Sequence, residues 1–199
     1  MPSSLIVLGM PHPGRISHDD ILAAARRLLE TDGPESVAMR ALARELGVSA
    51  PSLYFHVSSR EAVLDQLTEA GFAEFATVMQ AAFACAGCVR TRLRAMSEGY
   101  VAFAEQNPQL FTLMFGPCGR DLGFGVVGLE AAEPVIRLAT EIAGPEQGLT
   151  LAQALWSLVH GYTVLRLAGQ FHLNDDHETA FERGVDMLLA GVAATAAAR

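Results

Sequence analysis

Residues 49–56 combine small side chains with hydrogen-bonding side chains in one short segment. The side chains expected to be exposed there are Ser49, Ala50, Pro51, Ser52, Tyr54 and His56. A helix that reads DNA needs small residues where its backbone approaches base edges, and hydroxyl or imidazole groups where it meets phosphate. The segment supplies both kinds of group, so we predict that it is a DNA-recognition helix.

The residues that precede this segment fit the tight turn of a helix-turn-helix. Leu42 and Leu46 lie on one face of a predicted helix, and Gly47 permits the left-handed backbone that such a turn requires. Val48 and Leu53 can close a small shared core behind the turn. The other interpretation is a helical hairpin of an unrelated bundle, with Tyr54 and Phe55 buried as core residues.

Local capping signals predict the other helices of this head. Ser17 to Asp20 form a capping box for a first helix, which ends at Gly33-Pro34. We expect Ser36 to cap a second helix and Ser49 a third. Ser58 to Glu61 form a capping box for a fourth.

Longer helices are predicted behind the head, because apolar residues recur at spacings of three and four and no stretch alternates as a strand would. One helix is expected over 89–106, with Asn107 capping a short helix after it, and another is expected to end near 142 after a glycine-rich break at 116–128. Thr150 is expected to cap the penultimate helix, and the last helix has an acidic start at 175–178. The fold class is therefore all-α.

Two stretches resemble the signature of the TetR family of transcriptional regulators. The first runs from Ala43 through Arg44-Glu45-Leu46-Gly47-Val48-Ser49 to Val57, and the second is Ser58 to Leu64. The resemblance implies an N-terminal helix-turn-helix head of three helices over 15–62, and a sensing and dimerisation domain of about six helices over 63–199. It also implies a regulator that binds a palindromic operator as a homodimer, acts as a repressor and is not an enzyme.

The same resemblance implies roles for single residues of the head. Arg40 would read a base, and Pro51 would touch a thymine methyl group or a sugar. Ser52 and Tyr54 would bind phosphate, and His56 and Arg60 would hold the DNA backbone. Met39 and Ala50 occupy contact positions that are often polar in the family, so fewer base contacts are expected here.

The domain behind the head resembles one subgroup of the family, which carries a tryptophan-histidine-glycine motif. The matching residues are Trp156 to Gly161, together with Asn107 to Phe111. The family usually dimerises through its last two helices, and Gly161 suggests that another helix approaches closely there; packing inside one subunit is the alternative. The family also implies a small apolar effector, with candidate contacts at Met96, Tyr100, Phe103, Phe111, Met114, Phe115, Trp156 and His160. These residues could equally be core residues.

Composition and charge limit the other possibilities. Residues 1–60 carry six arginines and six acids, whereas 61–199 carry eight arginines and sixteen acids, which accounts for the net charge of −8. A neutral head with clustered arginines can approach phosphate, but the acidic remainder cannot.

No apolar stretch is long enough to span a membrane, and residues 1–14 look like a disordered leader rather than a signal peptide. We therefore expect a cytoplasmic protein.

Three further patterns could indicate other chemistry. Cys85 and Cys88 form a C-x-x-C pair, and a thiol- or metal-dependent redox protein is the alternative function, although zinc would need two more ligands and only Cys118 and distant histidines remain. Residues 123–128 match G-x-G-x-x-G, but no strand precedes them. The group His172, Asp175, Asp176 and His177 lies at a polar helix junction, where solvation and capping explain it. We expect no metal site and no cofactor.

Overall fold

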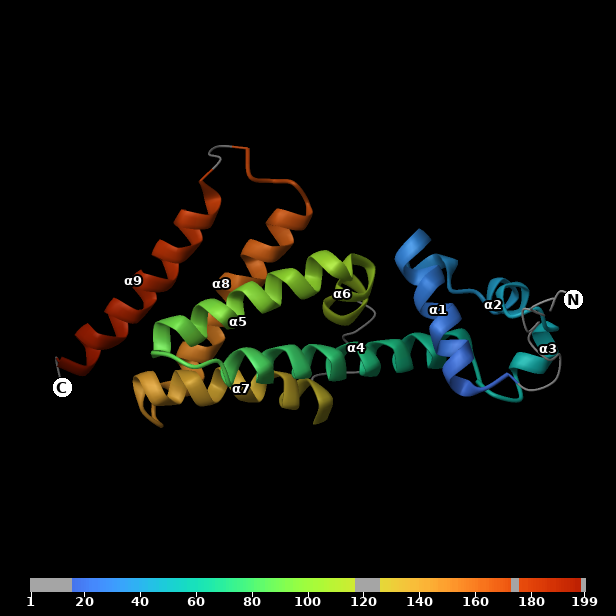
Figure 1. The fold of residues 1–199 in the computed structure, drawn as a ribbon, viewed down its shortest axis with the longest axis horizontal. Coiled ribbons are helices and arrows are strands. Elements are labelled where there is room, and N and C mark those ends of the chain that lie inside the picture. Colours follow the sequence, from blue (N-terminus) through green and yellow to red (C-terminus); the bar gives the residue numbers. More distant parts are fainter. Residues whose placement is uncertain (1–15, 117–125, 173–175, 198–199) are drawn as a thin grey trace, which may run out of the picture.

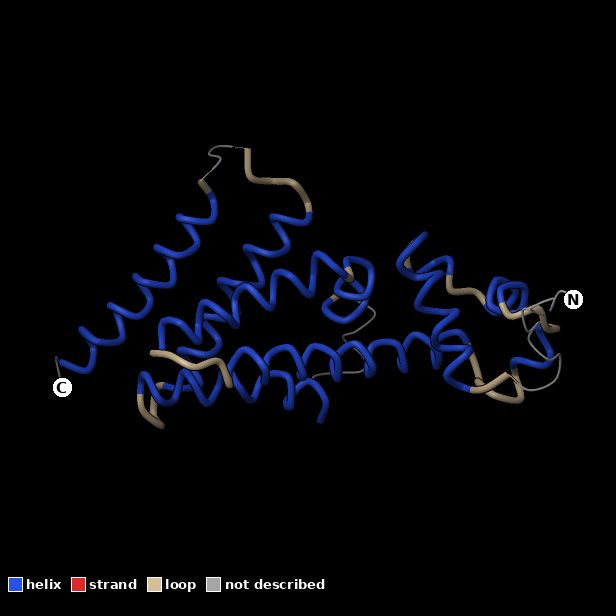
Figure 2. The backbone as a smooth tube through the Cα atoms, in the orientation of Figure 1, coloured by secondary structure: helices blue, strands red, loops and turns tan. Residues whose placement is uncertain are grey.

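The structure is a computed structural model, and it describes residues 16–116, 126–172 and 176–197. Over these residues the chain forms helices and no strand, which confirms the all-α prediction (Figure 2). A small N-terminal head lies at one end of an elongated molecule, and α4 runs from this head into the larger helical body (Figure 1).

The head contains α1 (His18–Asp32), a 3-10 turn η1 (Pro34–Ser36), α2 (Met39–Glu45) and α3 (Ala50–Leu53). The predicted capping box of α1 is confirmed, because the Ser17 hydroxyl accepts from the Asp20 N–H while the Asp20 carboxylate accepts from the Ser17 N–H. The buried face of α1 consists of Ile21, Ala24, Ala25 and Leu29. These apolar residues hold α1 against the other head helices.

The caps predicted at Ser36 and at Ser58 differ in the structure. Ser36 does not cap α2; it ends η1, and its hydroxyl donates to the carbonyls of Leu28 and Gly33, so that α2 begins three residues later. The fourth helix, α4 (Arg60–Phe83), starts one residue later than Ser58 would require, because Ser59 is the residue whose hydroxyl accepts from Ala62 N–H. Ser and Thr can bond several nearby backbone groups, and the sequence alone does not show which one they select.

The body contains α4, α5, α6, α7, α8 and α9. Their bounds after α4 are Val89–Gln106, Pro108–Phe115, Val126–Ala143, Gly148–Leu167 and His177–Ala197. The predicted helix over 89–106 is confirmed, and the helix expected to end near 142 ends at Ala143. Thr150 lies inside α8 rather than capping it, since the helix already begins at Gly148 and its N-cap residue, Gln147, makes no side-chain cap. The expected boundary at 62 falls in the first turn of α4, which head and body share.

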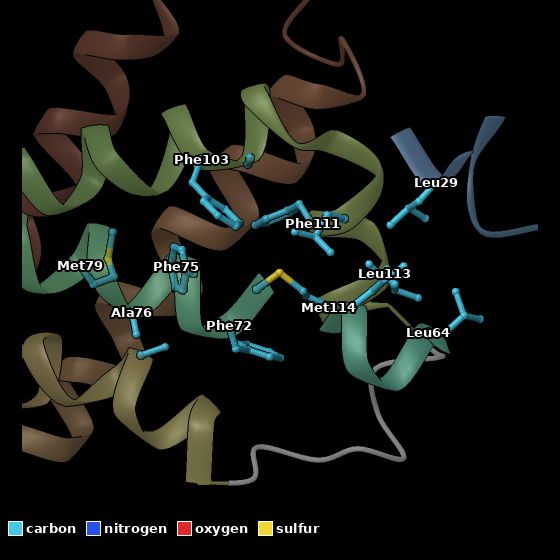
Figure 3. Packing of buried hydrophobic residues seen from close by; sticks show 14 of the residues in the cluster. Leu29, Leu64, Phe72, Phe75, Ala76, Met79, Phe103, Phe111, Leu113 and Met114 are labelled. Carbon is cyan, nitrogen blue, oxygen red and sulfur yellow. The ribbon is translucent and has the colours of Figure 1, made fainter. Parts of the chain in front are cut away.

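An aromatic cluster joins α4, α5 and α6 in the body (Figure 3). The Phe75 ring centroid lies 5.0 Å from that of Tyr100, in the edge-to-face arrangement that aromatic pairs favour, and 5.1 Å from that of Phe103. Gly71 allows α6 to approach α4 closely, because a Cβ atom there would lie 2.7 Å from Met114 Sδ. The packing therefore ties α6 tightly to α4.

Some of the sequence predictions fall on residues that the structure does not describe. These are the leader, Cys118, the first three residues of the G-x-G-x-x-G pattern, and Asp175. Among the described residues there is no group of three or more side chains that could hold a metal ion, and no helix that could cross a membrane.

Candidate functional site

The segment that follows the turn presents its polar and aromatic side chains outward. Leu53 and Val57 are buried and anchor the segment, whereas Tyr54 is 56% exposed, Phe55 is 90% exposed and His56 is exposed. This pattern contradicts the interpretation in which Tyr54 and Phe55 are core residues. Such exposed aromatic side chains on a small rigid head are typical of a contact surface.

The turn itself has the geometry that the sequence indicated. Gly47 has a φ of 68°, and the N–H of Val48 donates to the carbonyl of Ala43 at 2.9 Å. Ser49 is the N-cap residue of α3 but makes no cap; its hydroxyl lies 2.7 Å from that of Ser52. Both hydroxyls therefore lie together at the start of α3. Ser49 and Pro51 are exposed there, whereas Ala50 and Ser52 are partly buried.

The arginines of the head differ in how they are engaged. Arg27 pairs with Glu45, whereas Arg60 donates to the carbonyls of Val37 and Pro34 at 2.9 and 2.7 Å, tying the start of α4 to the turn before α2. Arg40 and Arg44 lie four residues apart on α2, and both are exposed. Neither has a carboxylate within ion-pair distance among the described residues.

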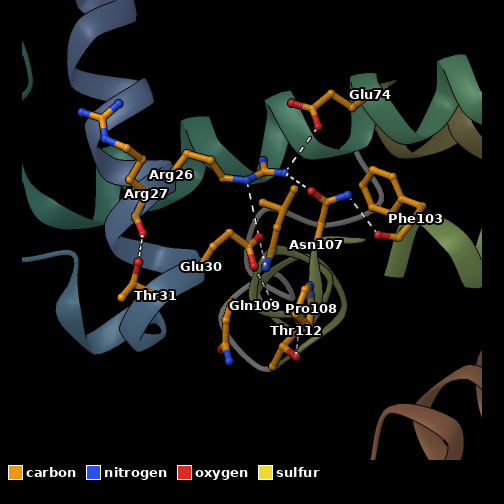
Figure 4. A network of polar contacts seen from close by, with 11 residues as sticks. Arg26, Arg27, Glu30, Thr31, Glu74, Phe103, Asn107, Pro108, Gln109 and Thr112 are labelled. Atoms are coloured by element: carbon orange, nitrogen blue, oxygen red, sulfur yellow. Dashed lines mark hydrogen bonds and ion pairs between the residues drawn. The ribbon is translucent and has the colours of Figure 1, made fainter. Parts of the chain in front are cut away.

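A polar contact between α1 and the start of α6 joins the head to the body (Figure 4). One oxygen of Glu30 accepts from the N–H of Gln109 at 3.2 Å and the other accepts from the N–H of Leu110 at 3.1 Å. These are free donors of the first turn of α6, so a carboxylate of the head caps a helix of the body. Arg26 donates to Asn107 Oδ1 at 2.8 Å and lies 3.4 Å from Glu30.

Asn107 was predicted to cap α6, and this prediction is wrong in its mechanism. Asn107 is the N-cap residue, but its side chain makes no cap to α6; its amide donates to the carbonyl of Phe103 and its oxygen accepts from Arg26. The capping oxygen atoms come from Glu30 instead. Because Glu30 lies 79 residues before Gln109 in the chain, no local pattern could reveal this contact.

An apolar cavity of about 340 Å³ lies in the body between α4, α5, α7 and α8, with α6 and α9 at its edges. It is lined mainly by aliphatic and aromatic side chains, with Ser97, Tyr100, Gln153 and Trp156 as the residues that carry polar atoms. None of the described lining residues carries a charge. Leu129 and Leu149 line the cavity and are also 58% and 57% exposed, so the cavity reaches the surface beside them.

The structure places half of the expected effector contacts in this cavity. Met96, Tyr100, Phe115 and Trp156 line it, whereas the others lie outside its lining: Phe103, Phe111, Met114 and His160. His160 lies directly behind Tyr100, with its Nδ1 atom 2.8 Å from the Tyr100 hydroxyl, and its ring stacks on Phe111 at a centroid distance of 5.6 Å. Burial lowers the pKa of His160 and raises the pKa of Tyr100, so both groups favour their uncharged forms.

Exposed apolar side chains also gather on the last two helices. On α8 they are Leu149, Trp156, Val164, Leu165 and Leu167, and on α9 the side chain of Met187 is 73% exposed. Gly161 lies one turn before Val164 and Leu165 on α8. A Cβ atom at Gly161 would meet nothing within 4 Å, so the space beside it is open in the single chain.

Several residues of these surfaces were not predicted from the sequence. Phe55 and Arg44 belong to the exposed face of the head, and the spacing of Arg44 four residues after Arg40 was a signal for it. The cavity also receives Phe72, Phe75 and Met79 from α4, and Ala131, Ala132, Val135 and Ile136 from α7. Their helical spacing marks an apolar face, but it does not show that this face borders a cavity.

Comparison with known families gives two matches. Residues 21–67 match the family described as bacterial regulatory proteins, tetR family, and residues 93–188 match the tetracyclin repressor-like, C-terminal domain. The first match covers most of α1, the turn and α3, and ends within α4. The second contains the whole of α6, α7 and α8, α5 without its first turn, and α9 as far as residue 188.

Two relatives described as HTH-type transcriptional regulators match this chain over most of their length. An HTH-type transcriptional regulator of Saccharopolyspora erythraea is 31% identical over 208 residues, covering 91% of this chain and 86% of that protein. An uncharacterized HTH-type transcriptional regulator of Mycobacterium tuberculosis is 28% identical, covering 94% of this chain and 86% of that protein. Among solved structures, a TetR variant from Acinetobacter baumannii in complex with minocycline has a TM-score of 0.64 at 25% identity, covering 89% of this chain and 96% of that one.

Proposed function

Since the chain belongs to the TetR family, whose members are DNA-binding transcriptional regulators and not enzymes, we propose that it is a repressor that binds a palindromic operator as a homodimer. A small, uncharged, apolar effector releases it from the DNA. The observation that carries this proposal is the segment after Gly47, which is anchored by Leu53 and exposes Tyr54, Phe55 and His56.

The head supplies the chemistry for DNA contact. In the proposed complex, residues 49–56 enter the major groove, where Pro51 and Ala50 lie near base edges while Ser49, Ser52, Tyr54 and His56 hold phosphates. The exposed Phe55 adds an apolar contact with a sugar or a thymine methyl group. Arg40 reads a base and Arg44 meets phosphate, because neither is neutralised by a carboxylate among the described residues. Arg60 supports the DNA backbone contacts through the turn that it holds in place.

Dimerisation through α8 and α9 would bury the apolar side chains that a single chain leaves exposed. Val164, Leu165 and Met187, on the last two helices, are between 45% and 73% exposed, so a partner chain that covers them would bury apolar surface. A two-fold axis would place the same patch of each chain against the other. A dimer would also present two heads, which a palindromic operator requires.

The cavity defines the proposed effector. A lining without charged groups favours an uncharged molecule, since an ionised group would lose its hydration without gaining a partner. Tyr100, Ser97 and Gln153 can each form a hydrogen bond with a polar group of such a ligand. A volume of about 340 Å³ lies at the small end of ligand pockets.

The contact between Glu30 and α6 provides a path from the cavity to the head. Phe115, at the end of α6, lines the cavity, and the start of the same helix is capped by Glu30 of α1. An effector that displaces Phe115 therefore shifts α6 and with it the orientation of the head. The effector binds better to the arrangement in which the two heads do not fit successive major grooves, and this difference in affinity shifts the population away from DNA.

The alternative function, a redox protein that uses Cys85 and Cys88, receives no support from the comparisons. A measurement of DNA binding distinguishes the proposed regulator from the redox protein. We expect the chain with both cysteines replaced by serine to bind its operator as the unmodified chain does, with an affinity that falls steeply as salt is raised. A chain without salt-dependent DNA binding, combined with a cysteine-dependent reaction, would overturn the proposal.

The effector can be sought by thermal unfolding with a panel of uncharged apolar compounds. A compound that binds the folded state raises the unfolding temperature, and a true effector also dissociates the chain from DNA. The matched control is Ala132→Phe, which fills the cavity from a half-buried position on α7. Provided that the circular dichroism spectrum of this variant is unchanged, equal stabilisation of both proteins would place the compound outside the cavity.

A further inference from the structure

Cys85 and Cys88 lie in the loop between α4 and α5, at the end of α4 that is remote from the head (Figure 1). Both thiols are exposed and free. The chain bends at Ala86 and Gly87, where Gly87 has a φ of 137°, so that α5 returns alongside α4. The bend brings two cysteines that are separated by two residues to the same turn.

The two thiols have different surroundings. Cys88 is the N-cap residue of α5, and its sulfur lies 3.4 Å from the hydroxyl of Thr91. Hydrogen bonds from the Thr91 hydroxyl and from the main-chain N–H groups of Thr91 and Arg90 lower the pKa of the Cys88 thiol. The Cys85 thiol instead donates to the carbonyl of Ala86 at 3.7 Å. Cys88 is therefore the better nucleophile of the pair.

We propose that Cys85 and Cys88 are a reversible modification site, which low-molecular-weight disulfides oxidise to an intramolecular disulfide that links the end of α4 to the start of α5. A third ligand for a metal ion is missing among the described residues, so the pair is not assigned to metal binding. The pair is proposed as a site at which a regulator is modified, not as the active site of a redox enzyme. Oxidation of the pair requires neither the operator nor the effector.

The proposed reaction takes place in two exchange steps. The Cys88 thiolate attacks one sulfur of the small disulfide, forming a mixed disulfide at Cys88 and releasing the other half as a thiolate. Cys85 then loses its proton to solvent and attacks the Cys88 sulfur of the mixed disulfide, forming the Cys85–Cys88 bond and releasing the second half as a thiolate. The protein pair loses two electrons, and the small disulfide is reduced to two thiols. An added thiol reverses both steps.

A disulfide between Cys85 and Cys88 would lie at the turn between two helices that line the cavity. Met79, near the end of α4, and Leu93 and Met96, near the start of α5, line the cavity. A disulfide fixes the separation of the two Cβ atoms at about 3.8 Å, so it restrains the turn that joins these two cavity walls.

The experiment uses the full chain with Cys118→Ser, so that only the pair remains, treated with oxidised glutathione and followed by intact mass. We expect loss of two hydrogens without a lasting glutathione adduct, and recovery of the original mass on addition of a thiol. In the same background, Cys85→Ser should trap one glutathione at Cys88. Cys88→Ser should gain an adduct several-fold more slowly, and Thr91→Val should slow the first step.

Lasting adducts on both cysteines, or no reaction at all, would overturn the intramolecular disulfide. Equal adduct rates for Cys85→Ser and Cys88→Ser would overturn the assignment of Cys88 as the attacking thiol. Because both side chains are exposed, we expect the serine variants to fold, and the unfolding temperature of each reduced variant provides the check.

Discussion

At the scale of single residues, Arg40 and Tyr54 are expected to contribute differently to DNA binding. Arg40→Ala should relax the preference for one base in each half-site by about 1–3 kcal/mol, because a bidentate arginine contact distinguishes that base from the others. Tyr54→Phe would remove the proposed phosphate contact and should weaken binding to every sequence by about 1 kcal/mol. Affinities for a set of single-base operator variants measure both effects, and equal loss from Arg40→Ala on every variant would show that Arg40 reads no base.

His160 should make the stability of the fold depend on pH. Its pKa is lowered from 6.5 by burial, so the unfolded chain binds a proton more readily than the folded chain. The stability that neutral His160 contributes is fully present above pH 6.5. It is lost as the pH falls through the lower pKa of the folded state. The free energy of unfolding, measured by urea titration between about pH 7 and 5, should therefore fall less steeply in His160→Phe. Parallel slopes for the two proteins would contradict this role.

At the scale of elements, the cap that Glu30 places on α6 is the contact most open to test. Glu30→Gln keeps the size of the side chain but removes its charge and one acceptor, so it should cost about 1–3 kcal/mol of stability. The amide protons of Gln109 and Leu110 should exchange faster with solvent, since their acceptors come from Glu30. The control is Glu69→Gln, an exposed position on α4. Unchanged protection of the two amides in Glu30→Gln would show that Glu30 does not cap α6.

The same elements show what the sequence could predict. The helix over 89–106 was predicted at its observed bounds because Asn107-Pro108 stops it locally, and the capping box at Ser17 depends on residues three apart. Ser36 was misassigned because a hydroxyl has several backbone partners within reach, and Thr150 because α8 already begins at Gly148. The cap of α6 by Glu30 and the contribution of α7 to the cavity depend on contacts between distant segments. Neither leaves a periodic or local signal.

At the scale of the whole molecule, Gly161 tests the proposed dimer. In a helix that faces solvent, Gly→Ala stabilises by about 1 kcal/mol. If a partner helix packs against Gly161, the added methyl group has no room, and Gly161→Ala should raise the dissociation constant of the dimer in sedimentation experiments. A uniform gain in stability, with no change in association, would mean that the open space beside Gly161 faces solvent rather than a second chain.

The distribution of charge over the molecule is consistent with one end approaching DNA. The whole net charge of −8 resides beyond residue 60, so the body is repelled by phosphate while the neutral head, with Arg40 and Arg44 exposed, is not. In a dimer joined through α8 and α9, two such heads would meet the duplex together.

DNA recognition by this chain requires that the short helix beginning at Ala50 enters the major groove. Selection of bound duplexes from a pool of random sequences, using the purified full chain, tests this most directly. We predict enrichment of one palindrome whose half-sites lie about one helical turn apart, and loss of that enrichment when Tyr54 and Phe55 are both replaced by alanine. A pool that stays random after repeated rounds, or that is enriched equally by the double variant, would contradict it.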